Sequence, residues 1–158
     1  MRELAADRAP HWEIHHVKRL DSLQPVSLLL LRLTLGLIFF TYGYPKLAHP
    51  GPAMHGFFVQ HGLPGWFVSV AGILEVFGGI LVALGLFTRP AALLLAMEMG
   101  VALWKVHSAK GYLAVHEYEF PLALAAACLA LATIGAGLLS FDHLLFGGKS
   151  RSTRAGNS

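Results

Sequence analysis

Four apolar stretches, each close to the length of a membrane-spanning helix, fill most of this chain. They cover residues 26–47, 66–87, 90–106 and 120–139, and an apolar helix needs ~20 residues to cross the hydrocarbon core of a bilayer. Charged residues make up 13% of the chain, against roughly 25% in soluble domains. The sequence therefore predicts an all-α integral membrane protein, a four-helix bundle with no room for a separate soluble catalytic domain.

The distribution of lysine and arginine predicts the orientation of this bundle. Both tails and the connection between the second and third spans are basic, whereas the opposite side has fewer cations: Arg2, Arg8, Lys18, Arg19, Arg89, Lys149, Arg151 and Arg154 against Lys46, Lys105 and Lys110. Cytoplasmic loops carry the excess of basic residues, so both termini are expected in the cytoplasm. The net charge of +3 does not indicate a nucleic-acid partner, because the basic residues form no patch with interleaved aromatic residues.

Proline, glycine and polar residues divide the chain into three parts. Residues 1–24 are a polar cytoplasmic tail, either a short amphipathic helix on the membrane surface or a disordered segment. Residues 25–146 are the membrane domain, and residues 147–158 are a disordered cytoplasmic tail. Within the membrane domain, breaks on both sides of residues 53–60 predict a short interfacial helix between spans one and two.

Three charged residues lie inside the spans, and a fourth, Glu119, lies at the mouth of the last span. A charge in hydrocarbon is costly unless it faces a partner or a wet cavity. With a rise of ~1.5 Å per residue from the cytoplasmic boundary, Arg32 lies ~10 Å deep, Glu98 ~13 Å and Glu75 ~21 Å. We therefore expect an Arg32–Glu98 ion pair, with Glu75 either reached by the arginine or protonated. Lys105 and Glu119 form a second, outer polar layer in this scheme.

The intramembrane charges share their helix faces with small residues. Arg32, Gly36 and Gly43 recur at helical spacing, and Gly72, Glu75, Gly79 and Ala83 do the same in the second span. Small residues let helices approach closely in a membrane. The charged faces are thus expected to be the packed faces. They serve either as a proton or quinone site lined by Arg32, Glu75 and Glu98, or as buried polar bonds that fix the helix register.

Cysteine and histidine give little support for a metal or dithiol site. Cys128 is the only cysteine, so a direct dithiol mechanism is excluded and a packing role is expected. The histidines near the outer surface show no tight ligand spacing, and no histidine lies within a span. Neither a metal nor haem is expected.

Several motifs, taken in order, resemble the DoxX family across residues 27–142. They are Arg32-Leu33-x-Leu35-Gly36-x-x-Phe39, Tyr42-Gly43-x-x-Lys46-Leu47, Glu75-x-x-Gly78-Gly79-x-Leu81-x-x-Leu84-Gly85-Leu86-x-Thr88-Arg89, the Met97 region, Glu119-Phe120-Pro121-Leu122 and Gly135-Ala136-Gly137-x-x-Ser140-x-Asp142. Ala136 departs from the proline that relatives often carry. The resemblance implies a four-helix, multi-pass protein of the inner (plasma) membrane of a bacterium or archaeon. Namesakes of the family are subunits of archaeal thiosulfate:quinone oxidoreductase, and other relatives are linked to thiol redox defence.

The resemblance and the buried charges together lead to one principal hypothesis and two alternatives. The first is a quinone-interacting subunit of a membrane redox complex for thiosulfate or thiol oxidation, in which Glu75 or Glu98 exchanges a proton. Its quinone would lie between aromatic side chains: Phe39, Phe40, Tyr42 and Trp104. The second hypothesis is a non-catalytic membrane anchor or assembly partner, and the third is a small-molecule carrier. Membrane lipid and either a protein partner or a second copy of the chain are the expected partners.

Overall fold

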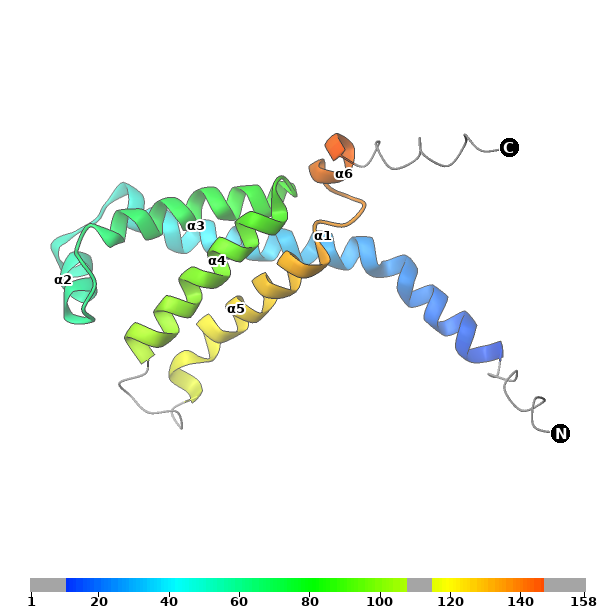
Figure 1. Ribbon diagram of the computed structural model, residues 1–158, viewed down its shortest axis with the longest axis horizontal. Coiled ribbons are helices and arrows are strands. Elements are labelled where there is room, and N and C mark those ends of the chain that lie inside the picture. Colours follow the sequence, from blue (N-terminus) through cyan, green and yellow to red (C-terminus); the bar gives the residue numbers. More distant parts are fainter. Residues whose placement is uncertain (1–10, 108–114, 147–158) are drawn as a thin grey trace, which may run out of the picture.

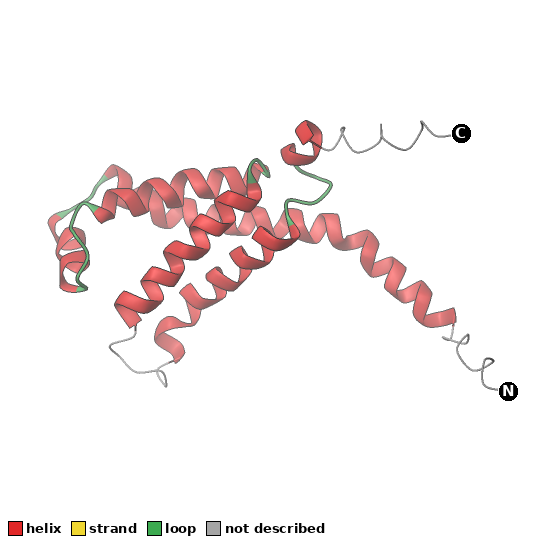
Figure 2. Ribbon diagram, in the orientation of Figure 1, coloured by secondary structure: helices red, strands yellow, loops and turns green. Residues whose placement is uncertain are grey.

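The computed structural model describes residues 11–107 and 115–146, with side chains from residue 22 to 105 and from 118 to 145. Within these residues the secondary structure consists of helices joined by short loops (Figure 2). The all-α prediction is therefore confirmed. The elements are α1 (His11–Ala48), α2 (Pro52–Gln60), α3 (Phe67–Leu84), α4 (Thr88–Ala102), the π-helical turn η1 (Leu103–His107), α5 (Val115–Ile134) and α6 (Phe141–Phe146).

Two helices are long and apolar enough to cross a membrane, judged by length and composition. They cover Ser22–Ala48 and Phe67–Leu84. The other two predicted spans are shorter as regular apolar helices: α4 has 15 residues before η1 adds five, and the apolar part of α5 covers Tyr118–Ile134. The four-span arrangement therefore stays a prediction.

The long helices form two pairs. Helix α1 packs along α3, and α4 packs along α5 at an oblique angle to the first pair (Figure 1). Aliphatic residues, Phe39 and the buried Cys128 fill the core between the pairs. The expected packing role of Cys128 agrees with its complete burial.

The small-residue faces of α1 and α3 meet as predicted. A Cβ atom added to Gly36 would lie 2.6 Å from Ala83 Cβ and 2.7 Å from the Gly79 carbonyl oxygen. A Cβ atom added to Gly43 would lie 2.6 Å from Glu75 Cβ. Because the residue numbers rise along α1 as they fall along α3, the two helices are antiparallel and in backbone-close contact.

Three predicted helix ends differ from the observed ones. Helix α1 begins at His11, and Pro25 lies inside it, so part of the predicted N-terminal tail is helical and continuous with the first apolar stretch. Helix α3 ends at Leu84 because Gly85 adopts a left-handed conformation with φ 71°, which terminates helices. Helix α5 ends at Ile134, before the positive φ angle of Gly135, five residues earlier than the apolar pattern suggests.

The short helix predicted for residues 53–60 is confirmed as α2, and its place at the membrane interface stays a prediction. It begins one residue earlier, at Pro52, because proline suits the first turn of a helix, where its missing N–H group is not needed. The predicted C-terminal tail, residues 147–158, lies outside the described residues.

Candidate functional site

The most buried ion pair in the described residues joins α1 to α3. Lys46 Nζ donates hydrogen bonds to both carboxyl oxygens of Glu75, each at 2.6 Å. The Glu75 side chain is 3% exposed, and that of Lys46 is 22% exposed. The close approach of Gly43 and Gly72 to the opposite helix brings the two side chains together. The ion pair lies near the C-terminal end of α1, which is the end next to α2.

The Arg32–Glu98 ion pair predicted from helix depth is wrong. Arg32 is 1% exposed, donates a hydrogen bond to the Leu139 carbonyl oxygen and lies against Gly85. It is therefore at the level of the α3–α4 turn. The depth estimate failed because it set Pro25 level with Arg89 as one cytoplasmic boundary, whereas the α1 residue that lies against the α3–α4 turn is Arg32.

Glu98 lies instead near the Lys46–Glu75 pair. Its carboxyl group interacts electrostatically with both Glu75 and Lys46. Its Oε2 atom is buried and has no hydrogen-bond partner among the described residues. A buried polar atom without a partner is rare in folded proteins, which marks Glu98 as a candidate for a functional role.

A cavity of about 640 Å³ connects these three side chains with a largely apolar wall. Its size lies within the roughly 300–1,000 Å³ of small-molecule sites. The lining comes from α1, α2, α3, α4 and the loop after α2: Tyr42, Lys46, Met54, Phe57, Phe58, His61, Leu63, Phe67, Val70, Ala71, Leu74, Glu75, Leu94, Met97, Glu98, Met99, Val101 and Ala102. An apolar chamber with a few converging polar groups is the usual form of a binding site for an amphipathic small molecule.

The structure separates the predicted site residues. Glu75, Glu98 and Tyr42 line the cavity, whereas Arg32 lies at the α3–α4 turn. Phe39 is in the core, and Phe40 stacks on Tyr44 with ring centroids 5.9 Å apart. None of the cavity-lining positions belongs to Phe39, Phe40 or Trp104.

Lys105 lies beside Trp104, with Nζ 5.0 Å from the ring centroid. The predicted outer layer of Lys105 and Glu119 stays a prediction. Of the outer histidines, His61 lines the cavity. The side chains of His107 and His116 lie outside the described residues.

Sequence analysis assigned Tyr42, Glu75 and Glu98 to a site but not the other residues of the cavity, among them Lys46 and those of α2. The spacing contained a signal for Lys46, because it follows Gly43 by three residues as Glu75 follows Gly72. In an antiparallel pair, two such faces bring the charged residues together. No comparable pattern places α2 beside the cavity, since the position of that short helix depends on the loops at its two ends.

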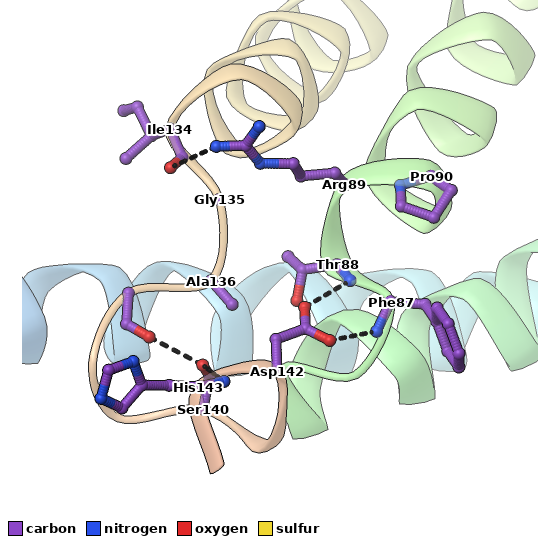
Figure 3. A pocket seen from close by; sticks show the side chains of 11 residues that line it. Phe87, Thr88, Arg89, Pro90, Ile134, Gly135, Ala136, Ser140, Asp142 and His143 are labelled. Carbon is purple, nitrogen blue, oxygen red and sulfur yellow. Dashed lines mark hydrogen bonds between the residues drawn. The ribbon is translucent and has the colours of Figure 1, made fainter. Parts of the chain in front are cut away.

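A second cavity, of about 610 Å³, lies at the other end of the molecule (Figure 3). Asp142 accepts hydrogen bonds there from the backbone N–H groups of Phe87 and Thr88, at 2.8 and 3.0 Å. It thereby caps the N-terminus of α4. Arg89 reaches across to the Ile134 carbonyl oxygen at 3.4 Å. These polar groups hold α6 and the end of α5 against the α3–α4 turn, so a structural role accounts for them.

Comparison with known proteins gives a consistent set of relatives. A family model described as DoxX matches residues 27–108. The "Putative oxidoreductase CatD" of Bacillus subtilis is 34% identical over 78% of this chain and 90% of its own length. The "Uncharacterized membrane protein Rv3486" of Mycobacterium tuberculosis is 30% identical over 97% of this chain and 98% of its own. The "Inner membrane protein YphA" of Escherichia coli is 32% identical over 76% and 91%. No solved structure matches the chain.

Proposed function

Because the chain belongs to the DoxX family of membrane proteins, we propose that it is a quinone-interacting membrane subunit of a redox complex for thiosulfate or thiol oxidation. The observation that carries this proposal is the cavity that ends at Lys46, Glu75 and Glu98. The name of the Bacillus relative, an oxidoreductase, supports the same class of reaction. The electrons would come from a protein partner.

The donor set of the cavity fits a quinone head. Lys46 donates hydrogen bonds, and a protonated Glu98 can donate one from the carboxyl group whose Oε2 has no partner. Aromatic rings from α1 and α2 supply flat apolar surfaces, among them Tyr42 and Phe58. A bound quinone would supply the redox chemistry, because its ring accepts two electrons and its two carbonyl oxygens take up two protons. Lys46, Glu75 and Glu98 would orient the head and hold or release a proton beside it.

We also propose that the chain is a multi-pass protein of a bacterial or archaeal inner membrane, with four spans and both termini in the cytoplasm. The basic α3–α4 turn supports this orientation, since Arg89 is exposed there. The Lys46–Glu75 pair lies at the opposite end of α1 and α3, which would place the cavity near the outer face.

Quinone binding by the purified full chain tests the proposal. In lipid nanodiscs we expect saturable binding of ubiquinone-type or menaquinone-type compounds. Quenching of the protein's tryptophan fluorescence measures this binding. Glu98→Leu removes a polar group from the cavity and is expected to weaken binding about tenfold, near the upper range for one lost hydrogen bond. Glu98→Gln keeps a hydrogen-bond donor and is expected to bind within about twofold of the unmodified chain.

The anchor hypothesis makes the opposite prediction. If the buried charges serve packing alone, the unmodified chain binds neither class of quinone, and Glu98→Leu changes only its thermal stability. That pair of results would overturn the proposed function. Glu119→Leu serves as the control, because Glu119 is exposed and is not among the cavity-lining residues.

A further inference from the structure

The polarity of the large cavity changes from one end to the other. Its two carboxyl groups lie deep, where Glu75 is 2% exposed and Glu98 Oε2 is buried, and the Lys46 side chain beside them is 22% exposed. At its outer rim Tyr42 of α1 lines the cavity and is 55% exposed. The rest of the exposed lining is apolar: Phe57 of α2 and Leu94, Met97 and Val101 of α4 line the cavity and are each at least 40% exposed. We call these four residues the mouth.

The mouth faces sideways from the helices rather than along them. Leu94 lies near the middle of α4 and Val101 near its end, so the mouth extends ~10 Å along the helix at ~1.5 Å per residue. Helix α5 packs against α4 but contributes no residue to the cavity lining. The opening thus lies on the side of α4 toward α2, and Figure 1 shows α2 on the same side of the molecule as the C-terminal end of α4.

An apolar rim suits contact with hydrocarbon. A site that takes its ligand from water needs no such rim, and exposed apolar side chains in a group mark contact with lipid or another apolar partner. A ligand that matches the whole cavity carries a polar head and an apolar tail, with the tail directed outward through the mouth.

We propose that the cavity receives its ligand from within the bilayer, as a quinone with an isoprenoid tail that leaves between α2 and α4 past Met97. This inference rests on the proposed function and adds the tail to the definition of the substrate. Met97, Leu94 and Phe57 then determine which tails are accepted, while Lys46, Glu75 and Glu98 contact the head alone.

The test compares quinones that share one head group and differ in the tail. Binding to the full chain in nanodiscs is measured for a tailless quinone and for the same head with two isoprene units. The concentration of each quinone is expressed as moles of quinone in the bilayer per mole of lipid. Met97→Trp narrows the mouth without adding charge. We expect it to weaken binding of the tailed quinone about tenfold and to change binding of the tailless quinone less than about twofold.

Leu93→Trp is the matched control, because Leu93 is 46% exposed on the same helix and does not line the cavity. It should leave both affinities unchanged. If Met97→Trp affects both quinones equally, or neither, the inference fails while quinone binding itself stands. If no quinone binds the unmodified chain, the proposed function fails first.

A second measurement does not depend on a substitution. A photoreactive group placed in the isoprenoid tail should label the peptide that contains residues 94–101 in the unmodified chain. Labelling confined to α5 or α6 would overturn the proposed path of the tail.

Discussion

At the scale of single residues, the buried pair of Lys46 and Glu75 decides how the polar end of the cavity is held. Both carboxyl oxygens accept from one ammonium group at 2.6 Å, so removal of Lys46 leaves the Glu75 carboxylate, 3% exposed, without its counter-ion. Breaking a buried pair is more costly than replacing both partners.

This asymmetry gives a prediction. We expect Lys46→Met to lower the free energy of unfolding by about 2 kcal/mol, because the Glu75 carboxylate loses its counter-ion. The double variant Lys46→Met with Glu75→Gln should recover at least half of that loss. Thermal unfolding in mild detergent measures both values. Equal stability of the single and double variants would contradict the coupling.

The same residues show the reach of sequence reasoning. Helical spacing correctly placed Gly36, Gly43, Gly72 and Gly79 on packed faces, because a helix repeats its faces regularly. The matching spacing of Gly43 to Lys46 and of Gly72 to Glu75 also indicated the partner of Glu75, but the depth estimate gave that place to Arg32. One mistaken boundary at Pro25 was enough to assign Arg32 to the wrong level.

At the scale of helices, the fit between α1 and α3 is set by backbone contact rather than by large side chains. A Cβ atom added to Gly36 would lie 2.7 Å from the carbonyl oxygen of Gly79. A backbone atom cannot move aside as the end of a side chain can. Small-residue contacts of this kind are a principal source of helix association in membranes.

We therefore predict that Gly36→Ala separates the two helices and destabilises the fold by about 2 kcal/mol through overpacking. Gly100→Ala is the control, since nothing lies within 4 Å of the added Cβ. It should be neutral or stabilising by up to about 1 kcal/mol, because alanine favours the helix. Thermal unfolding of both variants under one set of conditions checks this, and similar melting temperatures would contradict it.

The sequence predicted the short helix α2 more accurately than it predicted the ends of α3 and α5. Proline and glycine in the sequence located α2 to within one residue. The ends of α3 and α5 were placed too late, because Leu86, Phe87, Leu138 and Leu139 continue the apolar pattern beyond glycines that have positive φ angles. Hydropathy is insensitive to backbone conformation, and so it overestimates such helices.

At the scale of the whole molecule, the chain has two chemically different ends. One end holds the cavity, its ion pair and α2, and the other holds Arg32, Arg89 and the contacts of Asp142. The basic tails belong with the second end in the proposed orientation.

Fusions with reporter proteins test this orientation. A fluorescent protein that matures only in the cytoplasm should be bright when fused after Gly148, because the excess of basic residues favours that side. Alkaline phosphatase, which is active only outside the cytoplasm, should be active when inserted at Gly51. The reverse pattern, or activity of both reporters at one site, would contradict the topology with both termini inside.

The cap that Asp142 provides for α4 also bears on how the protein is made. The carboxylate that completes the α3–α4 turn comes from a residue 55 positions after Phe87. When the synthesis of α4 is complete at Ala102, the residue that caps the α3–α4 turn has not yet been synthesised. The hairpin can enter the membrane early, but its turn reaches the final hydrogen-bonded form only after translation is nearly complete. The last residues of the membrane domain thus complete the α3–α4 turn late in biogenesis. A chain truncated before Asp142 would lack the carboxylate that accepts hydrogen bonds from Phe87 and Thr88.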